Sequence, residues 1–224
     1  ALQENPTASY NTATGYQSLY QNTTGDKNTA LGYTSMVSNT TGSQNVGLGK
    51  DALQQNTTGN FNTAVGHAAL PLNTTASQNT AVGFQSLYSN TTGVDNVGIG
   101  KDALYSNTTA SNNAASGHSA LRNNTIGAQN TAFGRQSLYS NTTAGNNTAV
   151  GYQAGYNGTT AFNNAYFGIQ AGYSATTGQQ NTFIGRNAGY HVTTGSKNTI
   201  LGTYTGNQGG LDIRTSSNVI VLSD

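Results

Sequence analysis

A 17-residue repeat occupies most of the chain and constrains its fold more than any other feature. Each unit begins with asparagine, and eleven units follow one another without a gap. The units start at Asn11, Asn28, Asn45, Asn62, Asn79, Asn96, Asn113, Asn130, Asn147, Asn164 and Asn181. A longer unit of 20 residues starts at Asn198, and Asn218 opens the C-terminal tail. A fixed period of this length is typical of a solenoid, in which each repeat forms one coil stacked on the next.

The composition alone is compatible with disorder, but the regular repeat argues against it. Only 34% of the residues are hydrophobic, and 7% are charged. Disordered tracts do not need the same residue type at every seventeenth position. The net charge is +1, without a basic patch, and there is no cysteine. We therefore expect no nucleic-acid partner, no disulfide or thiolate metal site, no cofactor and no membrane insertion.

Within one unit, numbered 1 to 17 from its asparagine, several positions keep their chemistry. Position 5 is glycine in all twelve units, which indicates a positive φ or a close backbone approach. Position 4 is mostly a large apolar residue, and position 9 is leucine or methionine in the first eight units. Positions 12–15 read Asn-Thr-Thr-Gly or a close variant, which is typical of turns. We predict two extended segments per coil, at about positions 1–5 and 8–11, no helix, and a core built from positions 4 and 9.

Positions 1 and 3 carry two further expectations. The asparagine at position 1 either stacks into a ladder of amides along the coils or serves only as a turn residue. Position 3 is mostly alanine or glycine, as at Ala64, Ala81 and Ala132. With apolar residues on both faces, the strand is expected to be covered on both faces, one of them by a neighbouring chain. This pattern predicts an oligomer.

The character of the repeat changes along the chain. From Asn147, position 9 becomes glycine, at Gly155, Gly172 and Gly189, and position 3 then becomes large, at Tyr166 and Phe183. The exchange suggests that the two columns touch. We divide the chain into a lead-in (1–10), a solenoid segment with leucine at position 9 (11–146), one with glycine there (147–202) and a C-terminal strand or tail (203–224).

The repeat resembles the shaft and receptor-binding region of bacteriophage tail fibres and tailspikes. The resemblance is carried by the Asn-Thr-Ala-Val-Gly and Leu-Tyr-Ser-Asn-Thr-Thr motifs of 79–93 and 130–143. The C-terminal stretch 216–224 is similar to the sequence that leads into an endosialidase-type intramolecular chaperone, which trimerises the fibre and cleaves itself off. A more distant likeness is to the heads of trimeric autotransporter adhesins. The resemblance implies a parallel, intertwined or packed homotrimer in a virion tail.

Two columns of the repeat are candidates for a recognition surface. Position 10 is rich in tyrosine, which either stacks on sugars or closes the edge of the core. Position 6 varies in size and charge. The candidate residues for binding a receptor or glycan are Tyr88, Tyr105, Tyr139, Tyr156, Tyr173, Tyr190, Lys50, Lys101, Arg135 and Arg186.

Catalytic and metal chemistry have weaker support. The seven acids are spread along the chain, and Asp51 and Asp102 lie three coils apart, about 14 Å at the spacing of strands. That distance exceeds the separation of a glycosidase pair. His67 and His118 share position 6 and either form rings in a trimer or belong to a variable exposed column. We expect no enzyme and no metal site.

The function that we expect is therefore structural and adhesive: a phage tail-fibre segment that attaches to a polysaccharide or protein receptor on a bacterial surface. One alternative is an ice-binding solenoid, because position 13 is threonine in all eleven full units. The paired threonines are adjacent, however, so that in a strand they point to opposite faces. Another alternative is a secreted adhesin or glycoprotein fibre. The Asn-Thr-Thr turns match the N-glycosylation pattern at Asn22, Asn39, Asn56, Asn73, Asn90, Asn107 and Asn141.

Overall fold

The computed structural model describes residues 1–3 and 7–223. Glu4 and Asp224, two of the seven acids, lie outside the described residues. The chain forms two compact units, residues 1–112 and 113–224, which are described separately. Every regular element in the described ranges is a strand, and no helix occurs there. The predicted all-β solenoid with a 17-residue coil is confirmed.

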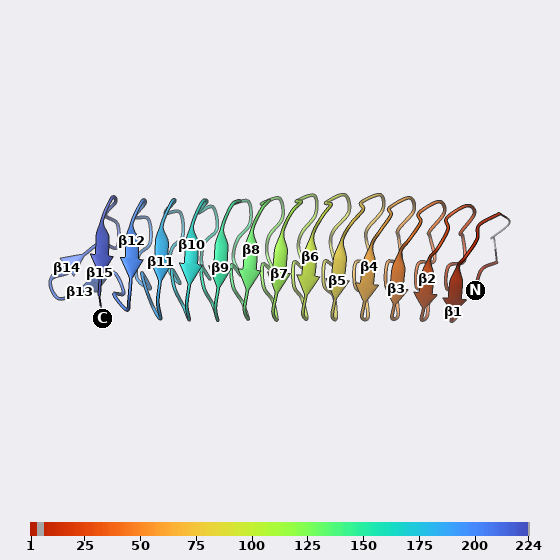
Figure 1. Ribbon diagram of the computed structural model, residues 1–224, viewed down its shortest axis with the longest axis horizontal. Helices are drawn as coiled ribbons and strands as arrows, with labels where there is room; N and C mark the ends of the chain where they lie inside the picture. Colours follow the sequence, from red (N-terminus) through yellow and green to blue (C-terminus); the bar gives the residue numbers. More distant parts are fainter. Residues whose placement is uncertain (4–6, 224) are drawn as a thin grey trace. The chain divides into compact units, whose positions relative to one another are not determined.

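The first unit contains six short parallel strands that pair in chain order (Figure 1). They are β1 (Thr12–Thr14), β2 (Thr29–Leu31), β3 (Val46–Leu48), β4 (Thr63–Val65), β5 (Thr80–Val82) and β6 (Val97–Ile99). Each strand covers positions 2–4 of one repeat. Partners lie 17 residues apart, as in the pairing of Ala64 with Ala81. Each strand is thus one step of a coil.

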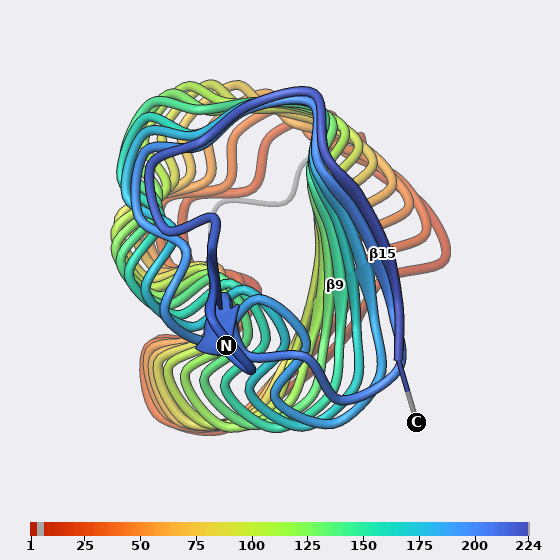
Figure 2. The same ribbon diagram turned by 90° about the vertical axis from the view of Figure 1, so that its left-hand side faces the viewer.

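The second unit repeats this arrangement. Its coils contribute β7 (Ala114–Ser116), β8 (Thr131–Phe133), β9 (Thr148–Val150), β10 (Ala165–Phe167), β11 (Thr182–Ile184) and β12 (Thr199–Leu201). A further strand, β15 (Ile220–Leu222), pairs with β12. Viewed along the stack, β9 and β15 lie on one straight side of the coil, and the rest of each coil consists of rounded turns (Figure 2).

The glycine at position 5 is required by both conformation and space. Gly49 has a φ of 134°, in a region that favours glycine. A Cβ on Gly49 would lie 2.5 Å from the carbonyl oxygen of Gly66 in the next coil. The column of glycines therefore allows successive coils to approach at the corner that follows each strand.

The expected second extended segment, at positions 8–11, was wrong. In the described residues, these positions form turns, and only positions 2–4 form a strand. Positions 7 and 9 have a positive φ, for example 54° at Gln85 and 51° at Leu87. Left-handed residues on either side of position 8 bend the chain instead of extending it. The turns still bond from coil to coil, since the Leu87 N–H donates to the carbonyl of Ala103 at 2.9 Å.

The assignment of the strand faces was also wrong. Position 3 points into the coil: Ala64 and Ala81 are fully buried. Position 4 points outward, so that Leu31 is 50% exposed and Phe133 is 60% exposed. The small residues at position 3 are needed because the side chains of positions 8 and 9 fill the interior. A Cβ on Gly47, for example, would lie 2.7 Å from the Ser35 hydroxyl and 2.9 Å from Met36 Cγ.

Two columns of buried asparagines line the interior. At position 1, Asn62 donates from Nδ2 to Asn45 Oδ1 at 3.2 Å, and its backbone N–H donates to the same oxygen at 2.9 Å. At position 12, Asn56 donates to Asn39 Oδ1 and accepts from Asn73, at 2.8 and 2.7 Å. Of the two alternatives for position 1, the structure shows the amide ladder, and position 12 forms a second ladder. These bonds satisfy polar groups that would otherwise be costly to bury.

The columns at positions 3 and 9 touch, as their exchange of volume predicted. In the second unit, a Cβ on Gly155 would lie 2.7 Å from the Tyr166 ring and 2.8 Å from Leu138 Cδ2. Tyr166 and Phe183 are buried, with ring centroids 5.6 Å apart. The larger side chains at position 3 occupy the space that leucine fills in earlier coils.

The last coil is longer than its sequence suggested. β12 pairs Thr199 with Ile220, so this coil has 21 residues and Val219, not Asn218, takes position 1. Its extra residues form a hairpin of β13 (Asn207–Gln208) and β14 (Leu211–Asp212).

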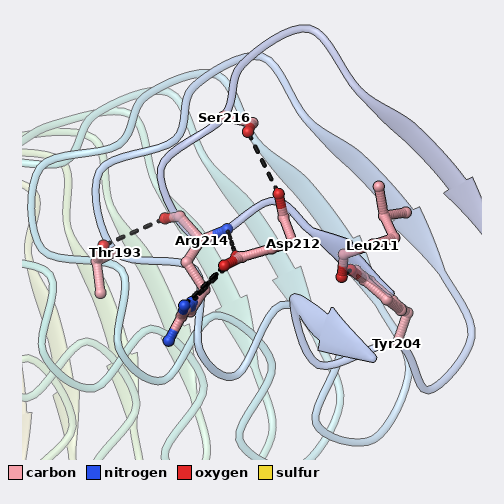
Figure 3. A network of polar contacts seen from close by, with 6 residues as sticks. All are labelled: Thr193, Tyr204, Leu211, Asp212, Arg214 and Ser216. Atoms are coloured by element: carbon pink, nitrogen blue, oxygen red, sulfur yellow. Dashed lines mark hydrogen bonds and ion pairs between the residues drawn. The ribbon is translucent and has the colours of Figure 1, made fainter. Parts of the chain in front are cut away.

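Side-chain contacts tie this hairpin to the coil. Arg214 binds Asp212 through two nitrogens at 2.7–3.1 Å, and Thr193 donates to the Arg214 carbonyl (Figure 3). The Tyr204 hydroxyl donates to the carbonyl of Leu211. Hydrogen bonds from Arg214 lower the pKa of the Asp212 carboxyl below its ordinary value.

Candidate binding surfaces

The first candidate surface is the outer face of the strands, formed by positions 2 and 4 and here called the sheet face. No charged residue occupies either position in β1–β12 or β15. Position 2 is mostly a half-exposed threonine, and position 4 is mostly leucine, valine, isoleucine or phenylalanine. Leu31, Ile99, Phe167, Ile184 and Leu201 are each at least 39% exposed.

Sequence reasoning expected a second covered face of the strand but assigned it to position 3, because it placed position 4 in the core. The absence of charge at position 2 as well as position 4 is consistent with either assignment of the faces. A core requires only one uncharged face of a strand, whereas here all three strand positions lack charge.

The second surface is the tyrosine column of position 10. In the second unit, Tyr139, Tyr156, Tyr173 and Tyr190 stack in sequence, with centroids 4.9–5.1 Å apart and ring planes within 8°. Tyr88 and Tyr105 stack in the same way in the first unit. These rings lie against one another, so a sugar cannot stack between them, and their edges and hydroxyls are what remain for a ligand.

The electrostatics of the column follow from this packing. Partial burial, and then the neighbouring phenols of Tyr139 and Tyr173, raise the pKa of Tyr156 above its ordinary value. A row of hydroxyl groups, one per coil, can donate and accept hydrogen bonds. The geometry therefore favours the alternative of a structural ladder, and it leaves a polar edge available for recognition.

The third surface is the column of position 6, which is exposed and mixes cations with rings. In the first unit, Lys50 lies over the Tyr33 ring at 5.9 Å and Lys101 over Phe84 at 5.8 Å. In the second unit, Arg135 lies over Tyr152 at 5.9 Å, and Arg186 is also exposed. The candidate cations thus share one column within each unit, each with an exposed side chain.

The carboxylates and histidines do not gather into a site. Asp51 lies 3.7 Å from Lys50 and 3.8 Å from His67, both on the surface. Within residues 1–3 and 7–223, no group of three or more His, Cys, Asp or Glu side chains is placed to hold a metal ion. Over the same residues, the chain has no helix of the length and apolar character needed to cross a bilayer.

The Asn-Thr-Thr turns are not accessible for modification in the folded chain. The asparagines of position 12 are buried, and the Asn56 amide nitrogen also donates to the Gly59 carbonyl at 3.0 Å. The threonine hydroxyls of position 13 are also engaged, since Thr57 donates to the Thr74 carbonyl at 2.9 Å. A glycan on Asn56 would remove a buried donor and need space that the coil does not have.

No family model, curated protein or solved structure matches this chain.

Proposed function

We propose that this chain is a structural and adhesive segment of a fibre of the bacteriophage tail type, and that its copies assemble as a parallel homotrimer through the sheet face. In this proposal, the fibre belongs to a virion tail and attaches to a polysaccharide or protein on a bacterial surface. The observation that carries the proposal is the uncharged sheet face, on which each coil from β2 to β12 presents at least one apolar side chain that is half-exposed or exposed.

A second copy of the same chain is the partner that fits this face. Contiguous apolar patches of more than a few hundred Å² are rare on monomers and mark interaction sites. The outward side chains of the sheet face recur once per coil, every 17 residues. A parallel copy has the same spacing between its outward side chains. A closed, symmetric assembly leaves no copy of the face free for open-ended association. The earlier argument from position 3 does not apply, because those residues face the interior.

The mass of the purified chain in solution tests the proposal. Light scattering is expected to give about three times the 23.1 kDa of one chain. Leu31→Lys, in β2, places a charge on the sheet face and is expected to shift the mass towards that of one chain, because a buried, unpaired charge is costly.

Thr41→Lys is the matched control. Thr41 lies in the same coil as Leu31 but is exposed in a turn away from the strands. The variant is expected to keep the mass of the wild type. A folded wild-type chain with the mass of one copy would overturn the proposal, and so would equal loss of assembly in both variants.

An ice-binding surface is the second candidate, because the sheet face also presents the half-exposed threonines of position 2. Only β1 has threonine at both outward positions, Thr12 and Thr14. The exposed rings of Phe133 and Phe167 interrupt the flat surface that such proteins use. Thermal hysteresis of a wild-type solution distinguishes the candidates: a fibre segment gives none, and ice binding gives a concentration-dependent gap between melting and freezing.

A further inference from the structure

Charge is distributed unequally between the two units. Residues 113–224 contain five Arg or Lys side chains and two aspartates, whereas residues 1–112 contain three lysines and five acids. Their net charges of +3 and −2 account for the +1 of the chain. Within 113–223 the only carboxylic side chain is Asp212, and it forms a bidentate pair with Arg214. The described part of this unit therefore carries an excess of cationic over carboxylic side chains.

Two of these cations lie in one exposed column. Position 6 of four successive coils carries Arg135, Tyr152, Ile169 and Arg186, all exposed. The Arg135 guanidinium lies over the Tyr152 ring, at 5.9 Å from its centroid. The column is therefore a cation, two apolar side chains and a second cation. We call it the arginine track.

The spacing of the track is set by the coils. The tyrosines of position 10 show a step of 4.9–5.1 Å per coil in this unit. Arg135 and Arg186 are three coils apart, hence about 15 Å for strands at this spacing. Beside the track, the amides of Gln136, Gln153 and Gln170 bond one another in a row at 3.0 Å. These side chains supply regular polar groups parallel to the track.

We propose that the arginine track binds an extended acidic polysaccharide that lies along the stack of coils. Carboxylate groups of the glycan pair with the Arg135 and Arg186 guanidinium groups, whose planar donors fit a carboxylate in bidentate fashion. Sugar rings between them contact the exposed side chains of Tyr152 and Ile169. This inference rests on the proposed attachment function and names the class of receptor: a linear glycan with acidic groups, not a neutral one.

A nucleic acid fits the track less well. A nucleic-acid strand carries a charge about every 3.4 Å, so cations about 15 Å apart would leave most phosphates without a partner. Proteins that bind single strands also offer ring faces on which bases stack. The tyrosines beside the track stack on one another instead.

The test measures binding of alginate oligosaccharides, which carry a carboxylate on every sugar, to the full chain at low salt. Carboxyl-reduced alginate and single-stranded poly(dT) are the comparison ligands. We expect alginate to bind more tightly than both. The double variant Arg135→Gln, Arg186→Gln should weaken binding about tenfold or more, because two charge-assisted contacts are lost.

Lys27→Gln, Lys197→Gln is the matched control. Both lysines are exposed at position 17, and the double variant removes the same net charge outside the track. It is expected to bind alginate like the wild type. Equal weakening by both double variants, equal binding of reduced alginate, or tighter binding of poly(dT) would overturn the inference. Light scattering of the same samples shows whether the chain is assembled. A failure of glycan binding can therefore be distinguished from a failure of the proposed assembly.

Discussion

At the scale of single residues, the leucines of position 9 combine burial with a backbone that leucine rarely adopts. Leu87 is fully buried and has a φ of 51°. Non-glycine residues in this region cost roughly 1–2 kcal/mol. The coil retains them because the side chain fills the interior next to position 3.

Truncation of Leu87 separates these two effects. Leu87→Ala is expected to lower the free energy of unfolding by about 2–5 kcal/mol, through lost contacts and a cavity. Leu87→Gly should be no less stable than Leu87→Ala, because glycine adopts a positive φ without strain. Denaturant unfolding measures both. At Val82, in strand β5, the usual order should hold, with glycine less stable than alanine. If glycine were also less stable than alanine at position 87, this result would contradict the argument from the positive φ of Leu87.

The buried phenol of Tyr166 gives a second prediction. Its hydroxyl has no hydrogen-bond partner, and burial raises the pKa of Tyr166 well above its ordinary value. Tyr166→Phe should stabilise the chain by about 1–3 kcal/mol, because it removes an unsatisfied buried group. The neighbouring coil already carries Phe183 at the same position.

The dependence of this effect on pH follows from the direction of the shift. Since the folded pKa is raised, the unfolded phenol ionises first, and wild-type stability falls as pH rises above about 10. The stability gap between Tyr166→Phe and wild type should widen over that range in urea titrations. A gap that stays constant above that pH would show that the hydroxyl ionises as readily in the folded chain as in the unfolded one, as a solvated phenol does.

At the scale of elements, the period and the strands at positions 2–4 could be predicted from the sequence, but the faces of the strands could not. Ala81 and Val82 are both apolar, and alternation alone does not tell which points inward. The deciding fact is that Ser86 and Leu87 of the same coil fill the interior. This filling of the interior depends on the left-handed backbone conformation of Gln85 and Leu87. Because neither residue is glycine, the sequence alone does not indicate this conformation.

The candidate site was predictable only in part, for a related reason. The sequence located the columns of positions 6 and 10, since these vary or repeat conspicuously. Whether Tyr156 offers its ring face or its edge depends on the distance between coils, which the stacking with Tyr139 and Tyr173 reveals. The sheet face was not predicted, because the sequence analysis assigned position 4 to the core.

The glutamine row of position 7 provides a prediction for an element. Gln136, Gln153 and Gln170 bond in sequence, but the next residue is Asn187, whose buried Oδ1 has no partner. Asn187→Gln is expected to extend the row by one bond and to raise the free energy of unfolding by about 0.5–1.5 kcal/mol. Thermal unfolding measures the change, and Gln153→Ala should act in the opposite direction. A destabilised Asn187→Gln variant would show that the row cannot be continued.

At the scale of the whole molecule, the proposed assembly gives the exposed apolar side chains of both units the same role. Each coil adds outward side chains from positions 2 and 4, so the buried area grows with the number of coils. The columns of positions 6 and 10 are not needed for this contact and remain available for a receptor.

Cross-linking through single cysteines tests directly whether copies meet through the sheet face. The chain has no cysteine, so one introduced thiol is unique. Val82→Cys lies on the sheet face of β5, and Thr92→Cys lies in an exposed turn of the same coil. With a short bifunctional maleimide at low protein concentration, Val82→Cys is expected to give covalently linked chains and Thr92→Cys single chains. Folded Val82→Cys protein that remains single, or equal linkage of both variants, would contradict assembly through this face.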